Sequence, residues 1–226
     1  AKIAEKYNFV DLLSECYTNL GSIYWNRCDY NKAINIYKKE IQLDSIKKDS
    51  LKMVSGYVNI GNIHLQQGNY DVSLKYLQKA IKFYSKLIDS PDTATANFSK
   101  RAMSYAQNNI GNIHLVQKDY DKAMDYYNKS LKLKEEINDI SGMAACYTNL
   151  GAILYRKKEL DSCIAYFEKA GKLYEKANNQ RGISKIYGNL GVLYKTKKNY
   201  SKAVEYYEKA LKIKYKIMPG PGAYLF

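Results

Sequence analysis

The chain has 226 residues and lacks the features that mark several large classes of protein. No apolar run approaches the roughly 20 residues that a helix needs to cross a bilayer, so we expect no membrane segment. The four cysteines form no CxxC pair and the two histidines are far apart, whereas a zinc site needs clustered Cys or His ligands. We therefore expect no metal site. The cysteine pattern favours the cytoplasm, with the periplasm as the alternative if the chain belongs to a membrane sensor.

The signatures of common enzymes are also missing. The sequence contains no phosphate-binding loop, dinucleotide fingerprint, HExxH motif or nucleophile elbow. Two adjacent carboxylates, Glu135 and Glu136, fall on a predicted surface helix. We therefore predict that the chain is not an enzyme and that it binds no cofactor.

One pattern, by contrast, occurs five times along the chain. Its first copy reads YTNLGSIYWNRCDYNKAINIYKKEI and its last reads YGNLGVLYKTKKNYSKAVEYYEKAL. The copies align on a glycine, and successive glycines lie 40, 50, 40 and 40 residues apart. These glycines are Gly21, Gly61, Gly111, Gly151 and Gly191. Internal similarity at such a period predicts stacked repeats and not a single globular core.

Each copy is predicted to form two helices joined by a short polar turn. In the first helix apolar residues recur at helical spacing, as at Tyr147, Leu150, Ile153 and Leu154. The second helix begins on a large residue, with polar residues beside it that can cap its free N–H groups. The pattern therefore predicts ten helices in five antiparallel pairs, with no β-sheet.

The second helix carries a small residue near its start and a large residue four positions later. A glycine on the first helix lets the second helix approach closely, and the large residue fills the space beside the small one. On this interpretation Cys163 is a buried small residue and not a nucleophile, while His64 and His114 serve packing. The small residues are Ala33, Ser73, Ala123, Cys163 and Ala203, and the large ones are Tyr37, Leu77, Tyr127, Phe167 and Tyr207.

This pattern of glycine, small residue and large aromatic resembles the tetratricopeptide repeat (TPR). The resemblance implies an all-α, right-handed superhelical solenoid of antiparallel helix pairs. The 40-residue unit, which lacks the family's usual closing proline, resembles the long-helix variety found in kinesin light chains, spindle-orientation adaptors and bacterial signalling proteins. It is most similar to the bacterial signalling arrays. The resemblance therefore implies a protein-protein interaction scaffold, the sensor or regulatory repeat region of a larger signalling protein.

The predicted boundaries follow from the alignment of the copies. Residues 1–8 align with the end of a second helix, so we expect them to belong to a truncated preceding repeat. Residues 9–217 hold the five helix pairs, and the ten extra residues of one unit form an insertion near 85–100, where Pro91 marks a turn or loop. The Pro-Gly pairs of residues 218–226 cannot continue a helix, and we expect a tail there.

Two residues before each glycine the chain always has asparagine, a poor helix former whose recurrence needs a cause. In long-helix arrays this residue resembles the one that holds a ligand's backbone in the concave groove. The alternative is that these side chains brace adjacent repeats. The predicted groove residues are Asn19, Asn59, Asn109, Asn149 and Asn189, with Asn62, Asn112, Trp25 and Tyr155 beside them. For Trp25, a role in filling an exposed joint stands as the alternative.

The formal net charge of +14, from 36 Lys+Arg against 22 Asp+Glu, suggests a second function. Polyanion or nucleic-acid binding would need these cations concentrated on one face, yet the predicted groove is basic only at Arg156, Lys185 and Lys195. We therefore expect a protein or peptide ligand and no nucleic acid. A third function is that of a self-associating spacer, in which exposed terminal repeats bind one another.

Overall fold

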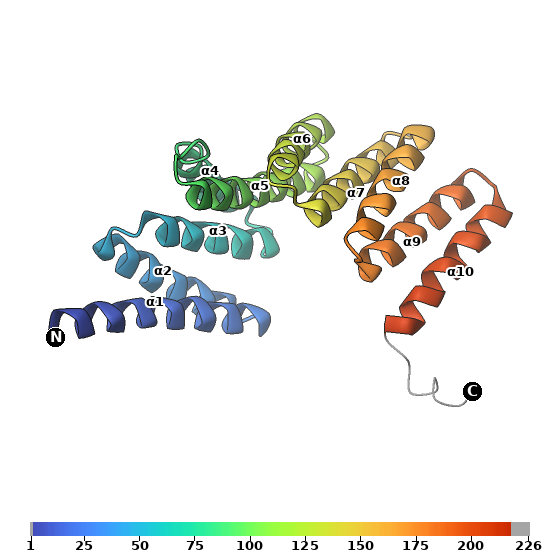
Figure 1. Ribbon diagram of the computed structural model, residues 1–226. Coiled ribbons are helices and arrows are strands. Elements are labelled where there is room, and N and C mark those ends of the chain that lie inside the picture. The colour runs from blue at the N-terminus through green and yellow to red at the C-terminus, as the bar shows by residue number, and fades with distance from the viewer. Residues whose placement is uncertain (1, 218–226) are drawn as a thin grey trace, which may run out of the picture. The chain divides into compact units, whose positions relative to one another are not determined.

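The computed structural model describes residues 2–217, except for the side chains of residues 2–8, 10 and 217 (Figure 1). The described residues form helices joined by short turns and contain no strand. Over residues 2–116, and again over residues 120–217, consecutive helices run in opposite directions, which confirms the predicted all-α fold of helix pairs. The helices are α1 (Lys2–Asn26), α2 (Tyr30–Lys47), α3 (Ser50–Gln66), α4 (Tyr70–Tyr84), α5 (Thr93–Val116), α6 (Tyr120–Glu136), α7 (Ile140–Arg156), α8 (Leu160–Lys176), α9 (Gln180–Thr196) and α10 (Tyr200–Ile217).

The chain divides into two compact units, Ala1–Val116 and Gln117–Phe226. In the first unit α1 packs on α2, α2 on α3, α3 on α4 and α4 on α5. In the second, α6 packs on α7, and the same order continues through α8 and α9 to α10. Each helix therefore contacts mainly its neighbours in sequence, as in a repeat array. No described helix is both long enough and apolar enough to span a bilayer.

Every turn between described helices, except the one between α4 and α5, has the same backbone feature. A residue in the left-handed conformation stops the first helix, as at Gly68 (φ 76°) and Lys158 (φ 64°). The next amide then bonds back into the last helical turn; Glu159 N lies 2.9 Å from the carbonyl oxygen of Leu154. At the joint before α7, Asp139 accepts a hydrogen bond from Gly142 N at 2.9 Å and so caps the new helix. These turns are short because stop and start signals are adjacent.

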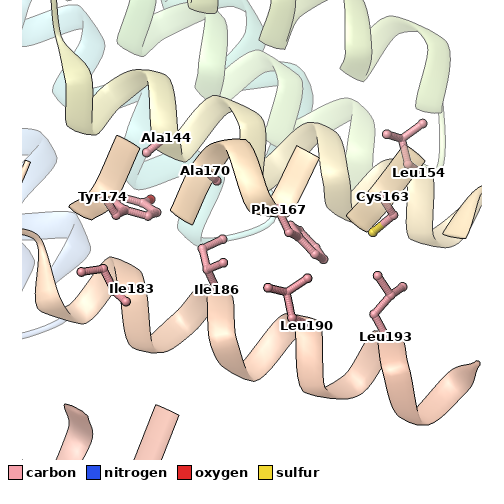
Figure 2. Close-up of a cluster of buried hydrophobic side chains, with 10 residues drawn as sticks. All are labelled: Ala144, Leu154, Cys163, Phe167, Ala170, Tyr174, Ile183, Ile186, Leu190 and Leu193. Carbon is pink, nitrogen blue, oxygen red and sulfur yellow. The ribbon is translucent and has the colours of Figure 1, made fainter. Parts of the chain in front are cut away.

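The predicted packing of glycine against a large residue is present. A Cβ atom added to Gly151 would lie 2.7 Å from the ring of Phe167, and one added to Gly21 would lie 2.6 Å from the ring of Tyr37. From the same position on α8, Phe167 also points toward Leu190 and Leu193 of α9 (Figure 2). Each such aromatic ring therefore fixes the spacing within its own pair and fills the core toward the next.

The small residue on the second helix has a further role that the pattern did not predict. Ser73 Oγ donates a hydrogen bond to the carbonyl oxygen of Gly61 at 2.7 Å, and Cys163 Sγ donates one to the carbonyl oxygen of Gly151 at 3.1 Å. Burial raises the pKa of the Cys163 thiol to about 11. The prediction that Cys163 is a buried packing residue is confirmed.

The insertion is partly helical. Only residues 85–92 lie outside α4 and α5, and Asp92 caps α5 by accepting a hydrogen bond from Thr95 N at 3.0 Å. The remaining extra residues lengthen α5 to 24 residues, compared with 17 in α3, α7 and α9. The irregular joint is thus narrower than the range of 85–100 proposed from the sequence.

At the other end of the first unit, α1 runs from Lys2 to Asn26 without the turn expected near residue 8. Residues 2–8 thus continue the first helix, instead of forming a separate second helix of another repeat. The reason lies at Phe9, which aligns with the capping Asp139 but has no side-chain acceptor that could start a new helix. The predicted tail at 218–226 lies outside the described residues.

Candidate peptide-binding surface

In the second unit, a pocket of about 270 Å³ lies along the first helices of two successive pairs. α7 and α9 supply its sides, and the ring of Phe167 from α8 closes part of it. The pocket exists because Gly151 draws Phe167 close to α7, while the neighbouring Ala152 has too short a side chain to fill the space. Its lining residues are Ala152, Tyr155, Arg156, Phe167, Asn189 and Val192.

A second pocket of about 470 Å³ adjoins the first, because Tyr155 and Arg156 line both. The Tyr155 hydroxyl lies 3.2 Å from Thr196 Oγ1, which ties the end of α7 to the end of α9. The residues that line it are Tyr120, Tyr155, Arg156, Lys158, Leu160 and Thr196. We call these two adjoining pockets together the α7–α9 groove.

The groove combines apolar walls with two lining cations, Arg156 and Lys158. Arg156 is exposed and forms no ion pair with any described residue, so its guanidinium can meet an anionic group of a ligand. Nearby lysines at the same helix ends are paired instead: Lys157 Nζ lies 2.9 Å from Asp121 and Lys197 Nζ lies 2.5 Å from Asp161. The local charge available to a ligand therefore comes chiefly from Arg156 and Lys158.

The five recurrent asparagines do not share one environment. Asn19 is exposed, whereas Asn59, Asn109, Asn149 and Asn189 are half-buried. The side chain of Asn189 lines the α7–α9 groove.

In the first unit, Asn109 of α5 donates a hydrogen bond of 2.6 Å to the side-chain oxygen of Asn62 on α3. That bond joins successive repeats and is the brace that the sequence left as an alternative. Asn112 is half-buried on the same helix.

Of the remaining predicted groove residues, Tyr155 lines a groove and Trp25 packs in a core cluster. Tyr155, 37% exposed, lies at the junction of the two pockets. Trp25 is half-buried and packs against the cluster of Ala33, Tyr37 and Ile60 in the first unit. Its position matches the joint-filling alternative.

Sequence reasoning missed Phe167, Leu160 and Thr196 as groove residues. Phe167 was assigned to the core alone, although its ring serves both the core and the pocket floor. Leu160 begins α8 and Thr196 ends α9. Both line the groove because these two helix ends lie beside the end of α7. The turn residues are the signal that could have pointed to them.

Comparison with known protein families decides the classification. Tetratricopeptide repeat models match residues 14–46, 58–136, 102–176 and 142–216. The chain belongs to the tetratricopeptide repeat family. No match was found among curated proteins.

Solved structures agree with the TPR classification. BtubC (BKLC) from P. vanneervenii is 19% identical over 96% of this chain and 85% of its own, with a TM-score of 0.77. The apo form of RapI is 18% identical over 94% of this chain and 57% of its own, with a TM-score of 0.73. A Rap protein complexed with Competence and Sporulation Factor is 19% identical over 89% of this chain and 54% of its own, with a TM-score of 0.67. At these identities the likeness establishes the fold.

Proposed function

We propose that this TPR chain binds an extended peptide, or an extended segment of a partner protein, along the α7–α9 groove. The observation that carries the proposal is the groove itself, where Asn189 and Tyr155 meet an apolar pocket and an unpaired guanidinium. The Rap protein bound to Competence and Sporulation Factor supports it, because that structure has the same fold and holds a ligand.

Each part of the groove has a separate role in this proposal. The amide of Asn189 offers both donors and an acceptor, which suits the backbone of an extended chain. The pocket beside Ala152 and Val192 accepts one apolar side chain, while Arg156 pairs with a carboxylate. One net hydrogen bond contributes about 0.5–1.5 kcal/mol and burial of one apolar side chain about 1.5–3 kcal/mol. Only a few such contacts fit here, so affinity in the micromolar range is expected.

We further propose that the repeats act as the sensing or regulatory region of a larger signalling protein. The chain spans 57% of the RapI chain with which it shares a fold, and this supports the idea that such arrays work within longer proteins. Five helix pairs, the first of which begins with α1 at Lys2, are the proposed repeat organisation.

The experiment begins with a pull-down from the source cell on immobilised chain, followed by mapping of the captured peptide segment. The synthetic peptide is then titrated against wild type, Asn189→Ala and Asn19→Ala. Asn19 has the same register but is exposed and lies in the other unit. We expect Asn189→Ala to weaken binding about 3- to 10-fold, the equivalent of one lost hydrogen bond, and Asn19→Ala to leave it unchanged. Equal affinities for all three proteins would refute the proposal.

A further inference from the structure

A second surface lies on the α3–α4 pair of the first unit, whereas the α7–α9 groove belongs to the second. The start of α3 and the end of α4 enclose a pocket of about 190 Å³. Its apolar lining comes from Met53, Val54, Tyr57 and Phe83, of which all but Val54 are half-buried. Three lysines complete the lining: Lys79 and Lys82 on α4, and Lys86 in the turn that follows it.

These lysines are not neutralised. None of the three forms an ion pair with a described residue, whereas the lysines that match Lys79 in α6 and α10 do. Lys129 Nζ of α6 lies 2.6 Å from Asp125, and Lys209 Nζ of α10 lies 2.5 Å from Glu205. At the register position of those two acids α4 carries Lys75.

Acids are missing from the whole of this segment, not only from the position of Lys75. Beyond Asp71, α4 and the residues up to 88 contain no Asp or Glu, whereas each of the other four second helices carries at least two acids in the corresponding stretch. Where α6 has Glu135 and Glu136, this segment has Ser85 and Lys86. This segment thus keeps the core positions of the repeat but lacks the acids of the other second helices, which leaves its lysines available to an anionic partner.

The arrangement of the cations describes that partner. Lys79, Lys82 and Lys86 are spaced by three and four residues; the first two lie one turn apart on α4, Lys86 follows in the turn after it, and all three line the same pocket. Carboxylates on one face of an amphipathic helix recur at the same spacing. Coulombic attraction at a solvated surface is weak for one pair, but three like charges beside one pocket focus the local potential.

The pocket beside these lysines favours a protein over a nucleic acid. Its walls are aliphatic and aromatic, which suits an inserted Leu, Met or Phe. Tyr57 could stack a base, but the ammonium of Lys79 lies 4.0 Å from the centroid of its ring and covers that face. A polyanion without an apolar side chain would leave the pocket unfilled.

We infer that the α3–α4 surface binds an acidic segment of a partner protein, with carboxylates on Lys79, Lys82 and Lys86 and one apolar side chain between Met53, Tyr57 and Phe83. The site is independent of the α7–α9 groove. It assigns part of the excess positive charge to one defined interaction surface.

An array of fluorescent acidic peptides, with Glu at helical spacing and one varied apolar residue, provides the probe. Binding is measured by anisotropy at low salt. The triple variant Lys79→Glu, Lys82→Glu, Lys86→Glu should weaken the best peptide more than tenfold. The matched control Lys132→Glu, Lys172→Glu, Lys212→Glu makes the same change in net charge at the register of Lys82 on the other second helices, and it should change affinity less than threefold. Circular dichroism verifies that both variants fold.

A second arm tests the pocket. Met53→Gln should weaken peptides with Leu or Phe about five-fold and leave a peptide with Ser in that place unaffected. The inference is overturned if no peptide binds saturably, or if the two triple variants lose affinity equally. It is also overturned if oligo(dT) binds more tightly than every peptide with the same dependence on these lysines.

Discussion

Replacing Gly151 with alanine should destabilise the second unit, although alanine is the better helix former by about 1 kcal/mol. The new Cβ would lie 2.7 Å from Cε1 and 2.8 Å from Cδ1 of the Phe167 ring. Phe167 is 4% exposed and packs against α9, so its ring cannot move without disturbing the next pair. Overpacking of this kind costs roughly 1–3 kcal/mol, which equals or exceeds the gain in propensity.

Gly188 supplies the matched control, because it lies inside α9 and an added Cβ would meet nothing within 4 Å. Gly188→Ala should therefore raise the free energy of unfolding by about 1 kcal/mol. Urea denaturation followed by circular dichroism measures both variants. The reasoning is refuted if Gly151→Ala stabilises the protein as much as Gly188→Ala does. The double variant with Phe167→Leu should recover part of the loss, since Leu77 holds that position in the second copy.

Three further results are expected. Asn109→Ala should lower the free energy of unfolding by about 1 kcal/mol, because Asn62 loses its donor; an unchanged urea midpoint would contradict the brace. Burial raises the pKa of Glu40 from 4.5 to about 7, so its contribution to stability is fully present below pH 4.5 and is lost as pH rises through about 7. If the free energy of unfolding of Glu40→Gln depends on pH just as that of the wild type does, this reasoning is contradicted. Ile23 is 52% exposed, while Leu193 at the same register is fully buried. The exposed apolar face of α1 should therefore drive concentration-dependent self-association, which Ile23→Lys abolishes. Sedimentation velocity that shows only monomer for the wild type at every concentration would exclude this self-association.

The helix pairs could be predicted from the sequence because their determinants are local. Gly151, Cys163 and Phe167 are linked by fixed spacing, and the structure places them in contact. The continuation of α1 could also be predicted, because Phe9 cannot cap a helix as Asp139 does. The similarity of residues 1–8 to the end of a second helix led to the wrong prediction instead.

The candidate site was less predictable, because it depends on neighbours in space. Asn109 and Asn189 have the same register, yet one bonds to Asn62 and the other lines a pocket. The difference arises from the residue that the adjacent repeat presents, and no single helix encodes it. The unpaired lysines Lys79, Lys82 and Lys86 could be found only by comparing the repeats position by position, because the net charge of the whole chain does not locate them.

Blocking the α7–α9 groove tests the central claim most directly. Ala152→Trp would place a large ring in the pocket, while Ala165→Trp adds the same ring to an exposed position of α8 outside it. Isothermal titration with the mapped peptide should show at least a tenfold loss of affinity for Ala152→Trp and no change for Ala165→Trp, at equal melting temperature. Wild-type affinity in the folded Ala152→Trp protein would contradict the account.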